Sequence, residues 1–202
     1  MQSSSLKWDR RYKWLSGSNI LTLFLLAGLV LMIFNSGSKS WMMRQMMNIG
    51  FFQAEMDENG SALPETPPGL VFQDGTGKKI DIAELTGKVI FINFWATWCG
   101  PCVAEMPSIN RLYEHYKDND KVLFFMVDVD SNYPKAQKFM DKKHLPLPVY
   151  IPAGPIPSNM LGGSIPCTVV IDKSGKMAFR HEGAADYDNK KFKDAILKLV
   201  ND

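Results

Sequence analysis

Two cysteines separated by two residues are the first feature of this 202-residue chain that could do chemistry. They are Cys99 and Cys102, within the stretch "WATWCGPCVAEMP". Such a pair could be a structural cross-link, part of a metal site or a working redox couple. A cross-link across so short a loop would add little stability. A zinc site would need two more ligands, and only Cys167 and three scattered histidines are available. We therefore interpret the pair as a redox couple and expect no metal.

The residues that flank the pair favour attack by one sulfur. The apolar run "VIFINFW" before it predicts a strand, and apolar residues at spacings of three and four predict a helix over 101–117. Cys99 would lie just before this helix, where unpaired N–H groups and the helix dipole stabilise a thiolate. The thiolate is the species that attacks disulfides. Cys102, one turn further on, would then close a disulfide with Cys99 and release the bound partner.

The N-terminal segment carries the whole basic excess of the chain. Residues 1–49 contain six basic residues and one acidic residue, whereas the remainder contains 17 basic and 20 acidic residues. Residues 20–34 are almost wholly apolar and follow a basic head, residues 1–14. We expect residues 15–35 to form a transmembrane signal-anchor, with residues 1–14 in the cytoplasm and the rest outside it. A cleaved signal peptide is the alternative. Nothing in the charge pattern points to nucleic acid.

Residues 36–67 are expected to hold a short juxtamembrane helix and a linker. Met42, Met43, Met46 and Met47 fall on one face of a helix. Thioether sulfurs would suit copper, but no His or Cys is close in the sequence. An amphipathic helix lying on the bilayer or capping the domain is the simpler interpretation. The stretch "AEMDENGSALPETPPG" then has the composition of a polar linker.

The pattern of apolar runs and turn residues over residues 68–202 predicts an α/β domain. A leading β-hairpin is predicted around Asp74 and Gly75. Two apolar runs, "VIFINFW" and "KVLFFMVDV", predict strands buried on both faces. Further helices are predicted at "YPKAQKFMDKKH" and "NKKFKDAILKLV", with a short strand at "VYI" and a second hairpin from "CTVVID" to "KMAFRHE". The order implies an α/β fold with a central sheet covered on both faces.

Over roughly residues 69–202, these features resemble the thioredoxin fold. The stretch "FWATWCGPC" carries the aromatic residues and the Gly-Pro spacer of thioredoxin, and Pro107 falls where that family kinks its helix. The later "SIPCTVVID" matches the cis-proline segment, which makes Pro166 the expected cis residue. The leading hairpin, the expected anchor and Glu105 narrow the resemblance to the membrane-anchored TlpA/ResA-like thiol-disulfide oxidoreductases. It implies a thioredoxin-like fold with an N-terminal β-hairpin extension, preceded by a single transmembrane helix.

The resemblance also implies a proton acceptor near the cysteines. Thioredoxin has a buried acid on the strand before its motif, but the neutral Asn93 stands at that position. Glu105, three residues after Cys102, matches the acid of the ResA-like group. Partial burial would raise the pKa of Glu105 and let it exchange protons with Cys102. The alternative is a helix residue that faces solvent.

Two further positions would shape the site. In this fold the backbone before the cis-proline pairs with an extended client chain, a form of strand addition. Trp98 and Ile165 would border an apolar platform around Cys99. Cys167 departs from the family, which usually has Thr or Ser there. It is either a small buried side chain that fills the same space or a third thiol able to form an alternative bridge.

The Gly-Pro spacer is that of thioredoxin, a reductant at about −270 mV, whereas strong oxidants of the fold lie near −120 mV. We therefore expect a reductase of protein disulfides at the inner membrane, with its catalytic domain in the periplasm. The resemblance implies clients such as the heme-binding cysteines of apocytochrome c. It also implies a transmembrane electron donor fed by cytoplasmic thioredoxin, and no cofactor.

The alternatives are a disulfide oxidant or isomerase and a copper carrier. A peroxidase of the related redoxin type would need a T-x-x-C motif and an Arg partner, and neither is seen.

Overall fold

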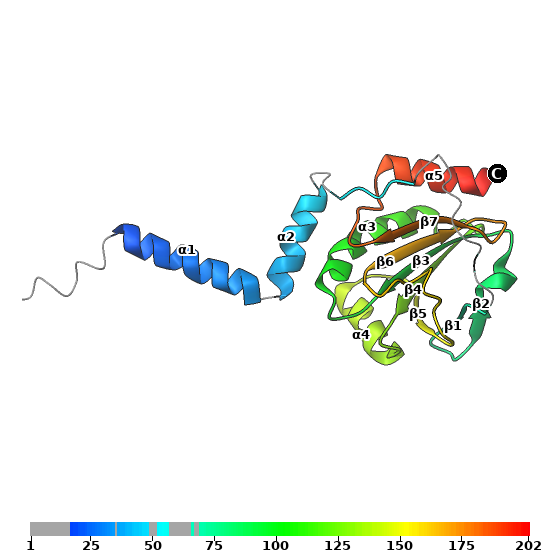
Figure 1. The fold of residues 1–202 in the computed structure, drawn as a ribbon, viewed down its shortest axis with the longest axis horizontal. Helices are drawn as coiled ribbons and strands as arrows, with labels where there is room; N and C mark the ends of the chain where they lie inside the picture. Colours follow the sequence, from blue (N-terminus) through cyan, green and yellow to red (C-terminus); the bar gives the residue numbers. More distant parts are fainter. Residues whose placement is uncertain (1–16, 35, 49–51, 57–65, 67–68) are drawn as a thin grey trace, which may run out of the picture. The chain divides into compact units, whose positions relative to one another are not determined.

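A computed structural model of the chain describes residues 17–34, 36–48, 52–56, 66 and 69–202 (Figure 1). The chain divides into two compact units, Met1–Lys39 and Ser40–Asp202. The described strands and the cysteine motif all belong to the second unit.

Helix α1, Gly17–Phe34, forms over the apolar N-terminal stretch. Its described apolar side chains, Leu21 and Phe24 among them, are exposed. In the part of the chain that the structure describes, no helix combines the length and the apolar character needed to cross a membrane. The structure therefore confirms a helix here but does not support the transmembrane helix expected over 15–35.

Helix α2, Ser36–Asn48, contains the methionine-bearing segment. Ser40 and Met47 are buried, whereas Trp41 and Met42 are exposed. The described part of the helix therefore has a covered side and an open side, as an amphipathic capping helix would.

Part of the expected linker packs against the domain. Gln53 forms an isolated β-bridge with Asp186, and the N–H of Ala54 donates to the Asp186 carbonyl at 3.1 Å. The Asn189 side chain donates to the Ala54 carbonyl at 2.9 Å. Ala54 is only 1% exposed. Residues 52–56 are thus held by the C-terminal part of the domain, and most of the remaining linker lies outside the described residues.

Seven strands of the second unit, among the described residues, form one sheet: β1 (Val71–Gln73), β2 (Lys79–Asp81), β3 (Val89–Trp95), β4 (Val122–Asp128), β5 (Val149–Pro152), β6 (Cys167–Ile171) and β7 (Met177–Glu182). Their order across the sheet is β2-β1-β5-β4-β3-β6-β7. Strand β3 runs parallel to β4 and antiparallel to β6, and every one of its residues is buried. The strand that leads to the cysteine motif is therefore fixed from both sides.

Three helices pack on one face of this sheet: α3 (Gly100–Tyr116), α4 (Tyr133–Lys143) and α5 (Lys190–Asn201). Their buried side chains share one hydrophobic cluster with strand residues such as Phe91 and Met126. Helix α3 connects β3 to its parallel neighbour β4, and α4 connects β4 to its parallel neighbour β5. Right-handed crossovers that step across a sheet in one direction place their helices on the same face. This explains why α3 and α4 lie together.

The opposite face is covered by shorter segments. Ile92 and Phe94 of β3 pack there with Phe72 of β1 and with Met160. The 3₁₀ helix η1, Ile82–Leu85, adds a further buried side chain. The sheet is covered on both faces, as predicted, but the three helices of the domain share one of them.

The predicted leading hairpin is confirmed and joins the main sheet. Strands β1 and β2 are antiparallel. Asp74 Oδ1 closes the turn by accepting from the N–H groups of Thr76 at 2.8 Å and Lys78 at 3.1 Å. Phe72 of β1 pairs with Pro152 of β5. The hairpin therefore extends the sheet at the edge beyond β5.

Candidate active site

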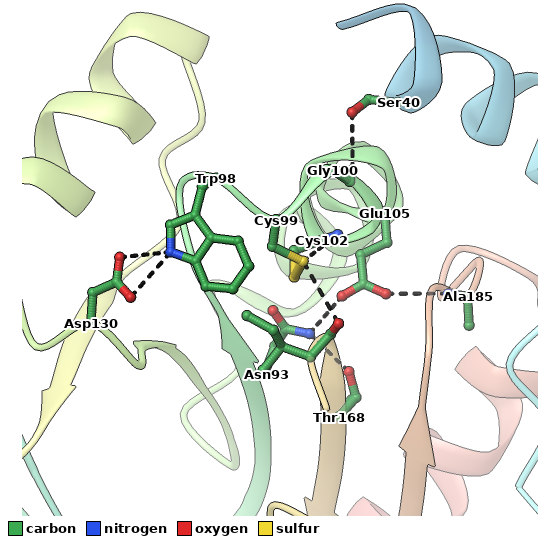
Figure 2. Close-up of a disulfide and its surroundings, with 11 residues drawn as sticks. Ser40, Asn93, Trp98, Cys99, Gly100, Cys102, Glu105, Asp130, Thr168 and Ala185 are labelled. Atoms are coloured by element: carbon green, nitrogen blue, oxygen red, sulfur yellow. Dashed lines mark hydrogen bonds between the residues drawn. A yellow bond between two sulfur atoms is a disulfide. The ribbon is translucent and has the colours of Figure 1, made fainter. Parts of the chain in front are cut away.

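The two cysteines of the CGPC motif lie at the junction of β3 and α3 (Figure 2). Helix α3 begins at Gly100, so Cys99 is its N-cap residue, with extended backbone (φ −76°, ψ 100°). Pro101 occupies the first turn, where its missing N–H would be unpaired in any case. The sulfur atoms of Cys99 and Cys102 are bonded at 1.98 Å, with Cα atoms 5.3 Å apart. The structure therefore contains the predicted disulfide.

The start of α3 contacts one sulfur of the pair. The backbone N–H of Cys102 donates to Cys99 Sγ at 3.2 Å. Donors at a helix N-terminus and the helix dipole stabilise negative charge. Cys99 is 4% exposed and Cys102 is fully buried. In the reduced protein the same N–H group and helix start would stabilise a thiolate on Cys99, the more exposed of the two residues.

The segment before β6 contacts the same sulfur. The carbonyl oxygen of Ile165 lies 3.8 Å from Cys99 Sγ, and the Ile165–Pro166 bond is cis, as predicted. Trp98 is 64% exposed, and its indole Nε1 donates to Asp130 Oδ2 at 3.0 Å. Figure 2 shows this ring beside the disulfide. Trp98 and Ile165 therefore both lie close to the disulfide, and their role in client binding stays a prediction.

Glu105 lies one turn after Cys102 on α3 and is fully buried, which excludes the solvent-facing alternative. Its Oε1 accepts from Asn93 Nδ2 at 2.7 Å, and its Oε2 accepts from the N–H of Ala185 at 3.2 Å (Figure 2). Burial raises the pKa of Glu105 from its ordinary value of 4.5 to about 8, and the bonds from Asn93 and Ala185 oppose part of that rise. A carboxyl group with this pKa can gain or release a proton near neutral pH.

Asn93, at the position of the thioredoxin acid, is part of the same buried network. It lies on β3 and is fully buried. Its Nδ2 also donates a hydrogen bond to Thr168 Oγ1 on β6 at 2.9 Å. Thr168 is fully buried as well. Asn93 therefore joins the acid of α3 to the strand that follows the cis-proline.

Cys167 faces the other side of the sheet from the disulfide. It packs with Phe94 and Met160, whereas Cys99 and Cys102 belong to the cluster on the helical face. Its thiol is free and buried and donates to the Met160 carbonyl at 3.2 Å. Burial raises the pKa of the Cys167 thiol to about 11. This placement favours the interpretation of Cys167 as a packing residue.

Three polar contacts of the site were not identified from the sequence. Asp130 follows β4, just as the cysteine motif follows the parallel strand β3. The carboxyl ends of parallel strands meet at one edge of a sheet, so the sequence could have indicated that Asp130 lies near the motif. Thr168 follows the cis-proline by two residues, and no motif in the sequence marks it as a residue of the site. Ser40 Oγ donates to the Gly100 carbonyl at 3.0 Å from 60 residues away, and nothing in the sequence indicates that contact.

The described residues contain no group of three or more His, Cys, Asp or Glu side chains placed to hold a metal ion.

Known proteins resemble this chain in sequence and in fold. Residues 58–196 match the family described as Redoxin. The thiol-disulfide oxidoreductase ResA of Bacillus thuringiensis (strain Al Hakam) is 34% identical over 154 residues, which cover 76% of this chain and 84% of that protein. The ResA of Geobacillus thermodenitrificans is 34% identical over 122 residues, covering 60% and 70% respectively. A solved thiol:disulfide interchange protein of the thioredoxin family from Chlorobium tepidum superposes with a TM-score of 0.52 and 26% identity, covering 68% of this chain and 95% of that one.

A disulfide at a helix N-terminus suits the thiol-disulfide chemistry for which these relatives are named. The chain belongs to the redoxin family and is a thioredoxin-like thiol-disulfide oxidoreductase of the ResA type.

Proposed function

We propose that this oxidoreductase reduces the disulfides of client proteins outside the cytoplasm. The observation that carries the proposal is the disulfide across the first turn of α3, where the N–H of Cys102 meets Cys99 Sγ at 3.2 Å. The Gly-Pro spacer supports the reducing direction, because thioredoxin, with the same spacer, has a potential of about −270 mV.

The proposed reaction moves two electrons from the dithiol to the client. The Cys99 thiolate attacks a client disulfide, forms a mixed disulfide and releases one client thiolate. Cys102 then loses its proton and attacks Cys99 Sγ. This step closes the Cys99–Cys102 bond and releases the second client thiolate. Each client thiolate takes up a proton, so the client gains two electrons and two protons.

Glu105 is proposed to take the proton of Cys102 in this step. It lies one turn along the same helix, and its pKa of about 8 is close to the ordinary value of a thiol. In the reverse direction, a protonated Glu105 supplies the proton to Cys102 when the donor opens the disulfide. Burial prevents bulk water from taking over this role.

The client is proposed to bind in extended form beside Cys99. The backbone around Ile165 lies against the sulfur, and Pro166 follows it in cis. A chain added there as a strand would carry its disulfide to Cys99. The exposed indole of Trp98 gives that client an apolar contact. This surface suits a range of disulfide-bearing proteins, including the apocytochrome c clients expected from the family.

We also propose that residues 15–35 hold the protein at the inner membrane with the catalytic domain in the periplasm. The proposal is supported by the uncharged stretch behind a basic head and by the exposed apolar side chains of α1. It implies a membrane-bound electron donor that passes electrons from cytoplasmic thioredoxin. Alkaline extraction of membranes should leave the full chain in the pellet and release a chain lacking residues 1–39. Release of the full chain would contradict the proposal.

The direction of electron flow is tested by equilibrating the protein with glutathione. A reductase should have a potential near that of thioredoxin, about −270 mV, and should catalyse the reduction of insulin. A potential near −120 mV, the value of strong oxidants, would overturn the reducing role. The Cys167→Ser variant is the matched control, because it removes the thiol that lies on the other sheet face.

A further inference from the structure

The segment that leads to the cis-proline runs from the far face of the sheet to the active site. Met160 is fully buried in the cluster on the face away from the helices, where Cys167 also packs. Ile165, further along the segment, packs against the clusters of both faces. Its carbonyl oxygen lies 3.8 Å from Cys99 Sγ. The position of Ile165 beside the sulfur therefore depends on what holds residues 160–164.

The middle of this segment contains two adjacent glycines, Gly162 and Gly163, and both are exposed. Glycine restricts the backbone less than any other residue. Gly163 also has a φ of +111°, which other residues rarely adopt. Residues 160–164 belong to no helix or strand that would fix them. The segment therefore depends on side chains from elsewhere in the fold to hold its backbone.

Strand β7 supplies these side chains. Arg180 and Glu182 are two residues apart on it, so they lie on one face, and Glu182 pairs with Cys167 across the ladder. Arg180 Nε donates to the Met160 carbonyl at 3.3 Å. Glu182 Oε2 accepts from Ser164 Oγ at 3.1 Å, while its Oε1 accepts from Arg180 Nη2. A single ion pair thus holds the segment at Met160 and again at Ser164.

The ion pair also lies against the backbone between these two points. A Cβ atom at Gly162 would lie 2.8 Å from Arg180 Nη2 and closer still to the Glu182 carboxylate. The hydrogen bond from Arg180, and after it the one from Ser164, lowers the pKa of Glu182 below its ordinary value. The carboxylate is therefore charged at neutral pH. Because partly exposed ion pairs add little to the stability of a fold, loss of this one should disturb the segment more than the domain.

We propose that Arg180 and Glu182 are positioning residues that hold Ile165 in the place where a client chain pairs with its backbone. They act through Met160 and Ser164 from the far face of the sheet. The inference rests on the proposed function, in which an extended client binds beside the disulfide. It adds that an ion pair on the edge strand of the sheet sets the client-binding backbone.

The test compares a protein client with a small disulfide that has no peptide backbone. Insulin can pair with the backbone at Ile165, whereas hydroxyethyl disulfide cannot. Both are assayed with the full chain in detergent micelles, with dithiothreitol as the source of electrons. In Glu182→Ala the ratio of kcat/KM for insulin to that for hydroxyethyl disulfide should fall by about threefold to tenfold, mainly through the insulin KM. Glu182→Gln keeps an oxygen that can accept from Ser164 and should give a ratio between those of Glu182→Ala and the native protein.

Two further variants keep the test decisive. Ser164→Ala removes only the hydroxyl that bonds to Glu182. It should lower the same ratio by about twofold, and it decides alone if Glu182→Ala does not fold. Glu114→Ala is the matched control, because it breaks a partly exposed ion pair with Lys117 near the end of α3. It should leave the ratio unchanged. Equal losses with the two substrates, or an unchanged ratio in both Glu182→Ala and Ser164→Ala, would overturn the inference.

A failure of this inference is distinguishable from a failure of the proposed function. A native protein that does not reduce insulin at all would contradict the reducing role. In that case a reduced, unfolded protein and mercaptoethanol replace the two disulfide substrates and are offered to the disulfide form. Exchange passes through the same mixed disulfide in both directions, so the same fall in the ratio is expected and the same outcomes would overturn it.

Discussion

The sulfur of Cys99 accepts a hydrogen bond from the backbone nitrogen of Cys102 at 3.2 Å and is also covalently bonded to the Cys102 sulfur. In the proposed reaction, the helix start that stabilises the attacking thiolate of Cys99 therefore also carries Cys102, the residue that completes the exchange. This is possible because Cys99 is the N-cap of α3 and Cys102 lies within its first turn. The two sulfurs differ chemically because of their places on one helix.

Replacing Glu105 with glutamine should remove a pH dependence from the opening of the disulfide. When an external dithiol opens the bond, Cys102 is a better leaving group if Glu105 supplies a proton. Glu105 holds that proton below its raised pKa of about 8 and lacks it above. The rate constant, corrected for the ionisation of the dithiol, should therefore fall as pH rises through 8 in the native protein. In the variant it should be flat and, below pH 8, lower by about a hundredfold.

Asp128→Asn is the matched control for that experiment. Asp128 is a second buried acid, at the end of β4, and its carboxylate accepts from the N–H of Asn132 at 3.0 Å. It is not part of the Glu105 network, so its variant should retain the native pH profile. A Glu105→Gln profile that still falls through pH 8 would exclude Glu105 from the proton transfer.

The buried acid should also make stability depend on pH. The folded protein keeps the Glu105 proton up to about pH 8, whereas the unfolded chain loses it near the ordinary value of 4.5. The free energy of unfolding contributed by this group should therefore be largest below pH 4.5, fall between 4.5 and 8, and stay constant above. The total loss should be about 4–5 kcal/mol at most.

Urea denaturation of the disulfide form at several pH values measures that slope. Because the introduced glutamine has no proton to lose, Glu105→Gln should flatten the curve and be the more stable protein at pH 9. Parallel curves for the two proteins would show that Glu105 ionises freely in the folded state.

The free thiol of Cys167 should be unreactive in the folded protein. It is fully buried beneath Met160, and its raised pKa disfavours the thiolate. Iodoacetamide should label Cys167 only after unfolding, and mild oxidation should yield only the Cys99–Cys102 bridge by mass mapping. A bridge from Cys167 to either motif cysteine would restore the interpretation of Cys167 as a third redox thiol.

A methyl group at Gly162 should disturb the segment at which client binding is proposed, the residues that lead to Ile165. Its Cβ would lie 2.8 Å from Arg180 Nη2 and closer still to the carboxylate of Glu182, so that ion pair would have to move. Glu182 also accepts from Ser164 Oγ at 3.1 Å, just before Ile165. Gly162→Ala should therefore raise the KM for insulin by about threefold to tenfold, with a smaller change in kcat.

Gly154→Ala provides the comparison, because its new Cβ would come no closer than 3.8 Å to another atom, the Gly69 carbonyl oxygen. It should leave KM unchanged. Equal KM values in the two variants would show that the contacts of Gly162 do not govern client binding.

The sequence was most informative where one local pattern determines the structure. Apolar runs predicted the buried strands β3 and β4, and the Gly-Pro spacer after Cys99 predicted a disulfide at the start of a helix. The cis bond before Pro166 followed from the family resemblance. In each case the residues that determine the feature are neighbours in the chain.

The features of the fold and of the site that the sequence did not predict depend on contacts between segments far apart in the chain. The side of the sheet on which α4 packs follows from the direction of the crossover, which no residue pattern encodes. The full burial of Glu105 depends on Asn93 and Ala185, which lie 12 and 80 positions away in the chain. The contact of Ser40 with Gly100 is of the same kind.

Trapping a client on the protein tests the central claim most directly. In Cys102→Ser, Cys99 can attack a client disulfide, but no second sulfur can release the product. Mass mapping after incubation with a disulfide-bearing client should find a mixed disulfide on Cys99, and Cys99→Ser should form none. A client bound through Cys102 in Cys99→Ser, or no adduct on Cys99 in Cys102→Ser, would contradict the account.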